Sequence, residues 1–263
     1  MSLRKYTYIL ILLTSTLLVS CTKETPYVIM LSMDGFRWDY ASKTETPNFD
    51  RLVQNGVHAA SIQPSYPSKT FPNHYSIATG LYPDHHGIVQ NNFYDPVLEQ
   101  SFRISNREAV SDSLYWGGEP IWETAEKQGV KSASYFWVGT ETQAYYQPSM
   151  RKMYEQDFPF DRRIDSVISW LSLPKKDRPH LILFYFHEPD GVGHDFGPDS
   201  KETIAMIEDL DQYLGDFLDK LELAQQELNI EVNFILTSDH GMGAIPEGQT
   251  IALNKIIDPD RLV

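Results

Sequence analysis

The stretch YVIMLSMDG at residues 27–35 decides the fold of this chain. Its first seven residues are almost uninterruptedly apolar, which predicts a strand buried on both faces, as in a parallel sheet. Asp34 and Gly35 follow directly, so the carboxyl end of the strand presents an acid to a turn. Because open α/β sheets hold their functional groups at the carboxyl ends of the strands, we expect an α/β fold with Asp34 at its functional edge.

Predicted strands and helices alternate along the rest of the chain, which indicates a mainly parallel sheet covered by helices. Thr46 and Pro47 suit the start of the next helix, with Phe49, Leu52 and Val53 on its inner face. The further expected elements are a helix at 120–128 with Ile121 and Trp122 inward, a strand at 132–137, a helix at 161–173, a strand at 181–186, a loop at 187–199, a long amphipathic helix beginning near Ser200, and a buried strand at 232–236.

The composition is that of a foldable, acidic chain. With 263 residues, 41% of them hydrophobic, it can bury a sizeable core. A formal net charge of −14 argues against a surface that coats nucleic acid, because such surfaces need clustered Lys and Arg. An anionic substrate would therefore need a local cationic site, which bound metal ions can supply.

The first 21 residues have the pattern of an export signal. Arg4 and Lys5 precede an apolar run at 8–19 that is too short to span a membrane comfortably. The run ends near Cys21, the only cysteine, in a sequence that resembles the lipobox of bacterial lipoproteins; an ordinary cleaved signal or a short anchor is the alternative. We therefore expect export from a bacterial cell, a lipid anchor on Cys21 that faces the periplasm or sits in the outer membrane, and a tether at 22–26.

Acidic and imidazole side chains recur where predicted strands end. Asp34 follows the first strand, Asp190 and His194 follow another, and Asp239 with His240 follows the last. Any one of them alone would be a common structural residue. Together at one sheet edge they form the carboxylate and imidazole ligand set that suits a zinc site with open positions for substrate.

A nucleophile candidate lies in the segment PSKTFPNH at 67–74. The pattern from Thr70 to Gly80 predicts a helix, which puts the Thr70 hydroxyl near the positive end of that helix, where backbone N–H groups favour an anionic phosphate. Thr70 is then either an activated nucleophile or merely an N-cap, and sequence position alone does not separate the two.

At these residues the chain resembles the nucleotide pyrophosphatase/phosphodiesterase family of the alkaline phosphatase superfamily. The matching motifs run in order over most of the chain after residue 26: DGFR at 34–37, KTFPNH at 69–74, TGLYP at 79–83, HGI at 86–88, NN at 91–92, GEPIW at 118–122, EPD at 188–190 with His194, and SDHGM at 238–242. The resemblance implies an alkaline phosphatase-like three-layer fold for a catalytic domain at 27–263.

The resemblance also implies two Zn²⁺ ions and a double displacement at phosphorus, with Thr70 as the nucleophile and a phosphothreonyl intermediate. The implied surroundings of the first zinc are Asp34, Thr70, Asp239 and His240, and two implied ligands of the second are Asp190 and His194.

The implied substrate is a small phosphodiester or pyrophosphate, expected to be a nucleotide, and no nucleic-acid polymer. Asn91 and the backbone N–H of Phe71 would stabilise a non-bridging phosphate oxygen. Phe71 and Tyr185 would form part of a slot for a flat base, and Ile104 and Tyr154 are weaker candidates for the same pocket.

The chain also departs from the family pattern, which adds a further zinc-binding histidine beyond the Asp239–His240 pair. No histidine follows His240 in these residues, so we expect the catalytic domain to be incomplete at its C-terminus. Two alternatives stay open: a phosphomonoesterase of the same superfamily, and a truncated, non-catalytic surface lipoprotein. The other histidines are not expected to complete the zinc site: His58, His74, His85, His86, His180 and His187.

Overall fold

The computed structural model describes residues 26–143, 146–246, 248–249, 251–252 and 255–257. The expected signal peptide with Cys21 lies outside these residues, as does the expected tether apart from Pro26. A five-stranded sheet in the order β5-β4-β6-β1-β7 forms the centre, and its pairings are parallel. Its strands are β1 (Tyr27–Met33), β4 (Ser132–Tyr135), β5 (Met150–Lys152), β6 (Leu181–Phe186) and β7 (Val232–Thr237).

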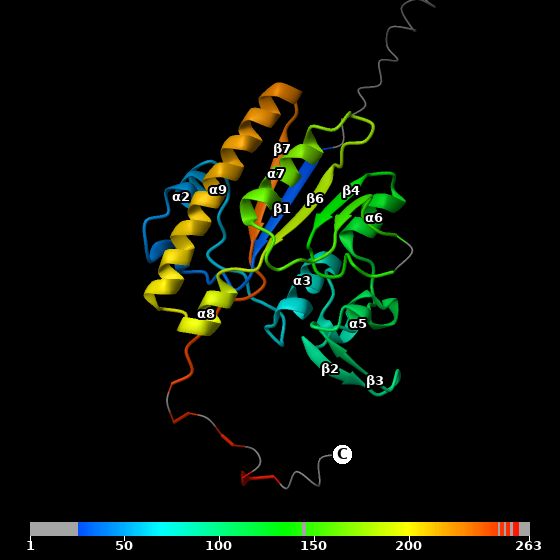
Figure 1. The fold of residues 1–263 in the computed structure, drawn as a ribbon, viewed down its shortest axis with the longest axis vertical. Coiled ribbons are helices and arrows are strands. Elements are labelled where there is room, and N and C mark those ends of the chain that lie inside the picture. The colour runs from blue at the N-terminus through cyan, green and yellow to red at the C-terminus, as the bar shows by residue number, and fades with distance from the viewer. Residues whose placement is uncertain (1–25, 144–145, 247, 250, 253–254, 258–263) are drawn as a thin grey trace, which may run out of the picture.

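Helices pack on both faces of this sheet (Figure 1). One face carries α2 (Pro47–Gln54), α7 (Phe160–Leu171) and α9 (Lys201–Leu228), and the other carries α3 (Thr70–Thr79) and α6 (Ile121–Lys127). The shorter elements are η1 (Tyr40–Ser42), α4 (Pro83–His86), α5 (Arg107–Ser111), η2 (Ser113–Tyr115), α8 (Asp190–Phe196) and an antiparallel hairpin of β2 (Asn92–Asp95) and β3 (Gln100–Arg103).

Strand β1 shows why the layers form. Ile29, Leu31 and Met33 are buried in the core shared with α2, α7 and α9, whereas Val28 and Met30 pack against the core shared with α3 and α6. Successive side chains of a strand point to opposite faces, so a strand covered on both faces needs a nearly continuous apolar run. The predicted three-layer α/β fold with a mainly parallel sheet is confirmed.

The helix predictions hold except for two side chains. Val53 and Ile121 were expected to face inward, and each is 44% exposed. A helix turns by about 100° per residue, so when Leu52 packs against the core, Val53 falls at the edge of the buried face. Trp122 takes the buried position beside Ile121 for the same reason.

The segment at 187–199 was expected to be a loop, and this prediction is wrong in part because residues Asp190–Phe196 form α8. The Glu188 carboxylate accepts a hydrogen bond from the Val192 N–H at 2.9 Å and so satisfies a free donor of the first turn. Strand β7 exists as predicted but is not buried, because it lies at the sheet edge with β1 as its neighbour and its side chains alternate between half-buried and exposed.

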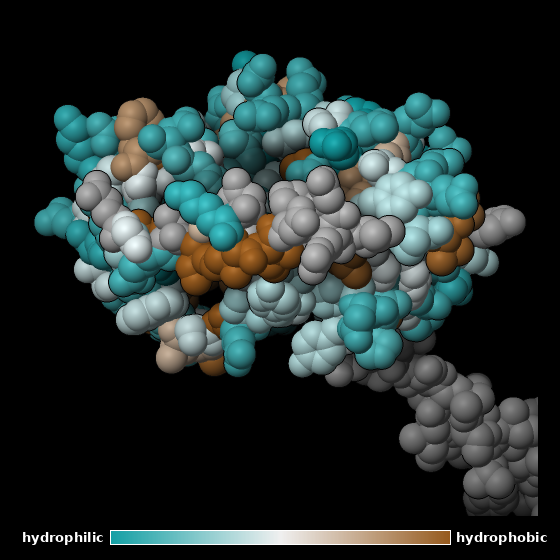
Figure 2. All heavy atoms as spheres, turned by 90° about the horizontal axis from the view of Figure 1, so that it is seen from below, coloured by the Kyte–Doolittle hydropathy of each residue, from teal (hydrophilic) through white to brown (hydrophobic). Residues whose placement is uncertain are grey.

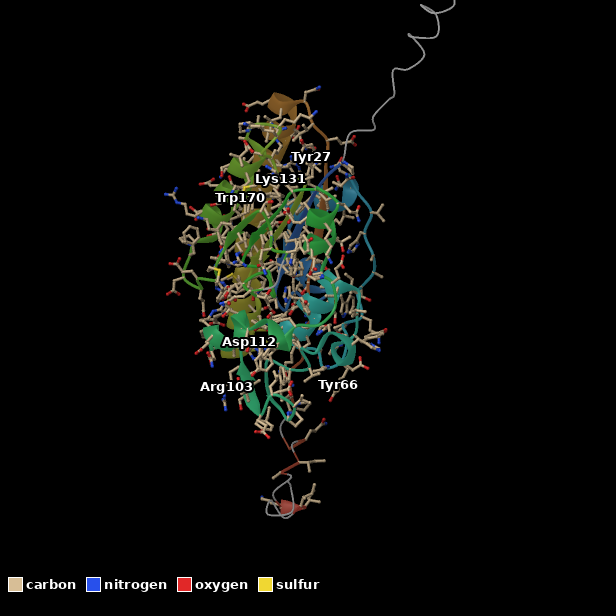
Figure 3. The ribbon with its side chains drawn as sticks, turned by 90° about the vertical axis from the view of Figure 1, so that its right-hand side faces the viewer. Tyr27, Tyr66, Arg103, Asp112, Lys131 and Trp170 are labelled. Atoms are coloured by element: carbon tan, nitrogen blue, oxygen red, sulfur yellow. The ribbon has the colours of Figure 1, made fainter. Side chains whose placement is uncertain are left out.

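The carboxyl ends of the parallel strands gather at one end of the molecule. In Figure 3, Tyr27 at the start of β1 and Lys131 just before β4 lie toward one end, whereas Arg103 and Asp112 lie toward the other. Figure 2 looks onto this second end, where mainly hydrophilic side chains surround a central hydrophobic group. Among the described residues, no helix is long and apolar enough to cross a membrane.

Candidate active site

Three acids from three strand ends meet at the carboxyl end of the sheet. Asp34 follows β1, Asp190 begins α8 after β6, and Asp239 follows β7. The Asp190 N–H donates to the Asp34 carbonyl oxygen at 3.1 Å, and the Gly35 N–H donates to Asp239 Oδ1 at 3.1 Å. Gly35 has φ +68°, and a Cβ there would come within 3.0 Å of Asp190 Cβ, so this close approach requires glycine.

The two predicted histidine ligands lie beside these acids. His240 Nε2 is 3.5 Å from Asp34 Oδ1 and 3.2 Å from Asp239 Oδ2. His194 Nε2 is 3.5 Å from Asp190 Oδ1, and its side chain is 65% exposed. Single ligand atoms of Asp34, Asp190 and His240 all lie within 4.8 Å of one another. The structure therefore brings the five predicted carboxylate and imidazole ligands together, with His194 on the open side.

The donor set fits a divalent cation. One carboxylate oxygen each of Asp34, Asp190 and Asp239 is buried and has no hydrogen-bond partner among the described residues. A buried polar atom without a partner is costly, and buried charges are usually paired or bind metals. Burial, reinforced by the charge of Asp239, raises the pKa of Asp34 well above its usual range, and burial raises the pKa of Asp239 to about 7. A bound cation would relieve both effects.

Thr70 is the first residue of α3, and the N-cap position belongs to Lys69. The reading of Thr70 as merely an N-cap is therefore not what the structure shows. Thr70 lines a cavity of about 560 Å³ together with Asp34 and Asp190. Beside it the Phe71 N–H donates to Asn91 Oδ1 at 3.0 Å, so the two predicted phosphate-binding groups lie in direct contact.

The same cavity collects the residues predicted for substrate binding. Phe71, Ile104, Tyr154 and Tyr185 all line it, as does Asn91. The cavity lining also includes residues that the sequence did not single out: Arg107, Phe136, Trp137, Glu141 and Gln156. His187, which was not expected to complete the zinc site, lines the cavity as well.

Tyr185 also makes a hydrogen bond that the sequence did not predict. Its hydroxyl donates to Asp34 Oδ2 at 2.6 Å, and burial together with the Asp34 charge raises the pKa of that hydroxyl well above its ordinary value. The Tyr185 ring centroid lies 6.2 Å from that of Tyr154. Tyr185 therefore connects the three acids (Asp34, Asp190 and Asp239), called the acid cluster below, to the aromatic side chains that line the cavity. The role of Tyr185 in a slot for a base stays a prediction.

His74 also lies at the acid cluster, with Nδ1 at 3.4 Å from Asp239 Oδ2. Distance alone would make it a metal-ligand candidate with Asp34 and Asp239. However, Nδ1 lies 2.9 Å from the Thr70 carbonyl oxygen and Nε2 lies 2.8 Å from Ser32 Oγ. Both ring nitrogens thus have protein partners, which argues against His74 as a ligand.

Comparisons with known proteins point to one family. The family model described as type I phosphodiesterase / nucleotide pyrophosphatase matches residues 28–263. A solved structure of murine ectonucleotide pyrophosphatase / phosphodiesterase 5, an inactive variant in complex with AMP, has a TM-score of 0.83 and 36% identity over 89% of this chain and 62% of that one.

Two curated relatives show the same likeness. Human ectonucleotide pyrophosphatase/phosphodiesterase family member 1 is 42% identical over 239 residues, which is 89% of this chain and 25% of the relative. An uncharacterised pyrophosphatase/phosphodiesterase of Schizosaccharomyces pombe is 42% identical over 233 residues, 88% of this chain and 48% of the relative. The chain thus spans between a quarter and about half the length of these relatives. Because the family model covers nearly all of the described residues, the chain belongs to the type I phosphodiesterase / nucleotide pyrophosphatase family.

Proposed function

We propose that this protein hydrolyses phosphodiester or pyrophosphate bonds of nucleotides, with Thr70 as its nucleophile. The observation that carries this proposal is the position of Thr70. It begins α3 and lines one cavity with Asp34 and Asp190, each of which has a buried carboxylate oxygen without a hydrogen-bond partner among the described residues that fits a cation. A hydroxyl, a helix N-terminus and a metal-binding cluster at one place are what attack on an anionic phosphorus centre requires.

The metal is proposed to be zinc, in two sites. Carboxylates and imidazoles in one cluster suit zinc with open coordination positions. When bound there, zinc would supply positive charge that lowers the pKa of a coordinated hydroxyl and neutralises phosphate charge. The proposed ligands of the first site are Asp34, Thr70, Asp239 and His240, and those of the second are Asp190 and His194.

The chain's own groups carry the proposed displacement. Thr70 Oγ1 loses its proton and bonds to phosphorus while the bond from phosphorus to the leaving oxygen breaks, and that oxygen departs with the electron pair and takes up a proton. Water then bonds to phosphorus as the bond from phosphorus to Thr70 Oγ1 breaks, and a proton from the water restores the Thr70 hydroxyl. The Phe71 N–H and the Asn91 amide lie at the start of α3, where they would bind a non-bridging oxygen as its charge grows.

A nucleotide is the proposed substrate because the cavity has aromatic walls beside the acid cluster. Phe71, Tyr154 and Tyr185 line it, and flat bases stack well on aromatic rings. The related murine structure holds AMP. A volume of about 560 Å³ falls within the range usual for small-molecule sites.

The test is hydrolysis of a thymidine 5′-phosphate 4-nitrophenyl diester beside 4-nitrophenyl phosphate, using zinc-loaded protein expressed from the complete reading frame that contains this sequence. Thr70→Ala should lower kcat for the diester at least about a thousandfold, since it removes the nucleophile. Thr79→Ala, at the far end of the same helix, is the matched control and should leave kcat unchanged.

Each other outcome points to a named alternative. Faster hydrolysis of the monoester would indicate a phosphomonoesterase. If the zinc-loaded protein turns over neither ester, the enzyme proposal fails and a non-catalytic surface protein becomes the better explanation.

We further propose that residues 1–21 direct export and that Cys21 carries a lipid. The support is the apolar run that ends near the single cysteine. Labelled palmitate should be incorporated into the wild-type protein in a bacterial host and not into Cys21→Ser. Equal labelling of both forms would reject the anchor.

A further inference from the structure

A buried histidine joins β1 to the first turn of α3. His74 is fully buried; its Nε2 contacts Ser32 Oγ on β1 at 2.8 Å, and its Nδ1 contacts the carbonyl oxygen of Thr70 at 2.9 Å. Its ring packs edge-on against Trp137 and Tyr185, at centroid distances of 5.4 and 5.1 Å. The ring is thus held on four sides.

The contact with Thr70 fixes which nitrogen carries a proton. A backbone carbonyl oxygen only accepts hydrogen bonds, so Nδ1 of His74 must be the donor. In the neutral ring, Nε2 is then an acceptor, and the Ser32 hydroxyl donates a hydrogen bond to it. A nitrogen that carries a proton has no lone pair for a metal, so this bond also keeps Nδ1 from acting as a ligand.

Because the peptide is planar, the contact that fixes the Thr70 carbonyl also fixes the direction of the Phe71 N–H at the substrate cavity. The Thr70 carbonyl and the Phe71 N–H belong to one rigid planar unit and point in opposite directions. Because the carbonyl is held toward His74, the N–H must point away from it, and it does so toward Asn91 Oδ1 at 3.0 Å. Asn91 and Phe71 both line the cavity.

The Phe71 N–H is one of the few N–H groups at this helix start that no backbone carbonyl takes up, since its partner is the Asn91 side chain. Residue 72 is proline and has no N–H, and the Asn73 N–H already donates to the Lys69 carbonyl oxygen at 3.1 Å. The backbone of the first turn therefore offers the N–H groups of Thr70 and Phe71 to an anion, with the anion taking the place of Asn91 Oδ1 as the acceptor for the Phe71 N–H. Rotation of the Thr70–Phe71 peptide would withdraw one of the two.

We propose that His74 is a positioning residue that locks the Thr70–Phe71 peptide, so that the Phe71 N–H, with the Asn91 amide, is presented to a phosphoryl oxygen in the transition state. This inference rests on the proposed function. It assigns His74 no contact with substrate and no place among the metal ligands.

Two isosteric substitutions separate the two ring contacts. The amide nitrogen of Asn occupies nearly the place of histidine Nδ1, so His74→Asn keeps a donor for the Thr70 carbonyl and loses the Ser32 contact. The amide of Gln reaches the place of Nε2, so His74→Gln keeps the Ser32 contact and loses the donor to Thr70. Ser32→Ala is the matched control, because it removes the Ser32 side alone.

The variants are compared in zinc-loaded protein from the complete reading frame, by kcat and KM for the thymidine diester, by dissociation constants for orthovanadate, and by zinc content. His74→Gln should lower kcat about 10- to 100-fold, somewhat less than outright removal of such a donor, and weaken orthovanadate binding by a similar factor. KM and zinc content should stay at the wild-type values. His74→Asn and Ser32→Ala should stay within about threefold of wild type in kcat and in orthovanadate affinity.

Opposite results would overturn the inference. Equal losses in His74→Asn and His74→Gln would make the histidine a packing residue, and a fall in zinc content would make it a metal-site residue. If His74→Gln does not fold, His74→Asn decides alone, since a large loss of kcat in a folded Asn variant contradicts the proposed lock. If the wild type shows no turnover, the proposed function fails, while orthovanadate binding still tests the peptide orientation.

Discussion

The acid cluster should destabilise the protein when metal is absent, and Asp239→Asn should relieve that cost. Asn matches the shape of Asp, and its carbonyl oxygen can still accept the Gly35 N–H that now donates to Asp239 Oδ1 at 3.1 Å. The substitution removes the buried charge and puts an amide NH2 in the place of Oδ2, which has no hydrogen-bond partner among the described residues. Metal-free Asp239→Asn should therefore be more stable than metal-free wild type at alkaline pH, although it has lost a proposed ligand.

The expected magnitude follows from the pKa of Asp239. Burial raises it from 3.8 to about 7, and each tenfold change in proton affinity represents about 1.4 kcal/mol, so the full cost is about 4 kcal/mol. The folded state holds the proton of Asp239 more tightly than the unfolded state does. The free energy of unfolding of the wild type therefore falls by this amount as pH rises from 3.8 to about 7. Most of the cost is present at pH 8 and under half of it at pH 5.

The assay is urea unfolding of chelator-treated wild type and Asp239→Asn at pH 5 and pH 8. The stability advantage of the variant should grow by about 2–3 kcal/mol between the two values. Zinc should reverse the order at pH 8, because it stabilises only the form that binds it. An advantage that is absent at pH 8, or that shrinks as pH rises, would refute the reasoning.

Three further outcomes are expected. Glu141→Leu should raise KM for a nucleotide diester about fivefold with kcat unchanged, because it removes the carboxylate that accepts the Tyr154 N–H at 2.6 Å. Steady-state kinetics would measure this change, and an unchanged KM would reject a role for Glu141 in shaping the cavity. Ser200→Ala should lower unfolding stability by about 1 kcal/mol, since Ser200 Oγ accepts the Thr203 N–H that begins α9; no change in urea midpoint would contradict this. Burial lowers the pKa of His86 to about 4, so the free energy of unfolding of the wild type should fall by about 2 kcal/mol relative to that of His86→Gln as pH falls from 6.5 to 4. If the unfolding free energies of the two proteins run parallel over this pH range, the prediction is wrong.

Much of the fold is readable from local patterns. The run at 27–33 predicts β1 because a strand covered on both faces needs apolar residues at successive positions. The exposure of β7 was not predictable in the same way, since an edge strand and a central strand have similar sequences and only the neighbours distinguish them. Helix α8 was missed because its start is stabilised by the Glu188 side chain, a single contact that apolar periodicity does not register.

Some residues of the candidate site could be predicted from the sequence, and others could be recognised only in the structure. The five carboxylate and imidazole ligands were predicted from their recurrence at strand ends, and parallel strands bring those ends together. His74 and Glu141 were missed because their roles depend on contacts with the backbone of Thr70 and Tyr154, which no spacing in the sequence reports. The direct contact between Asn91 and the Phe71 N–H was likewise visible only once both elements were packed.

Covalent capture on Thr70 tests the proposed nucleophile most directly. Zinc-loaded protein is mixed with the thymidine diester, quenched in acid within one turnover, and digested for mass spectrometry. The prediction is that the peptide containing Thr70 carries the thymidine phosphoryl group, and that neither this adduct nor turnover survives in Thr70→Ala. Turnover that persists in Thr70→Ala, or an adduct on another residue, would contradict the assignment of Thr70 as the nucleophile.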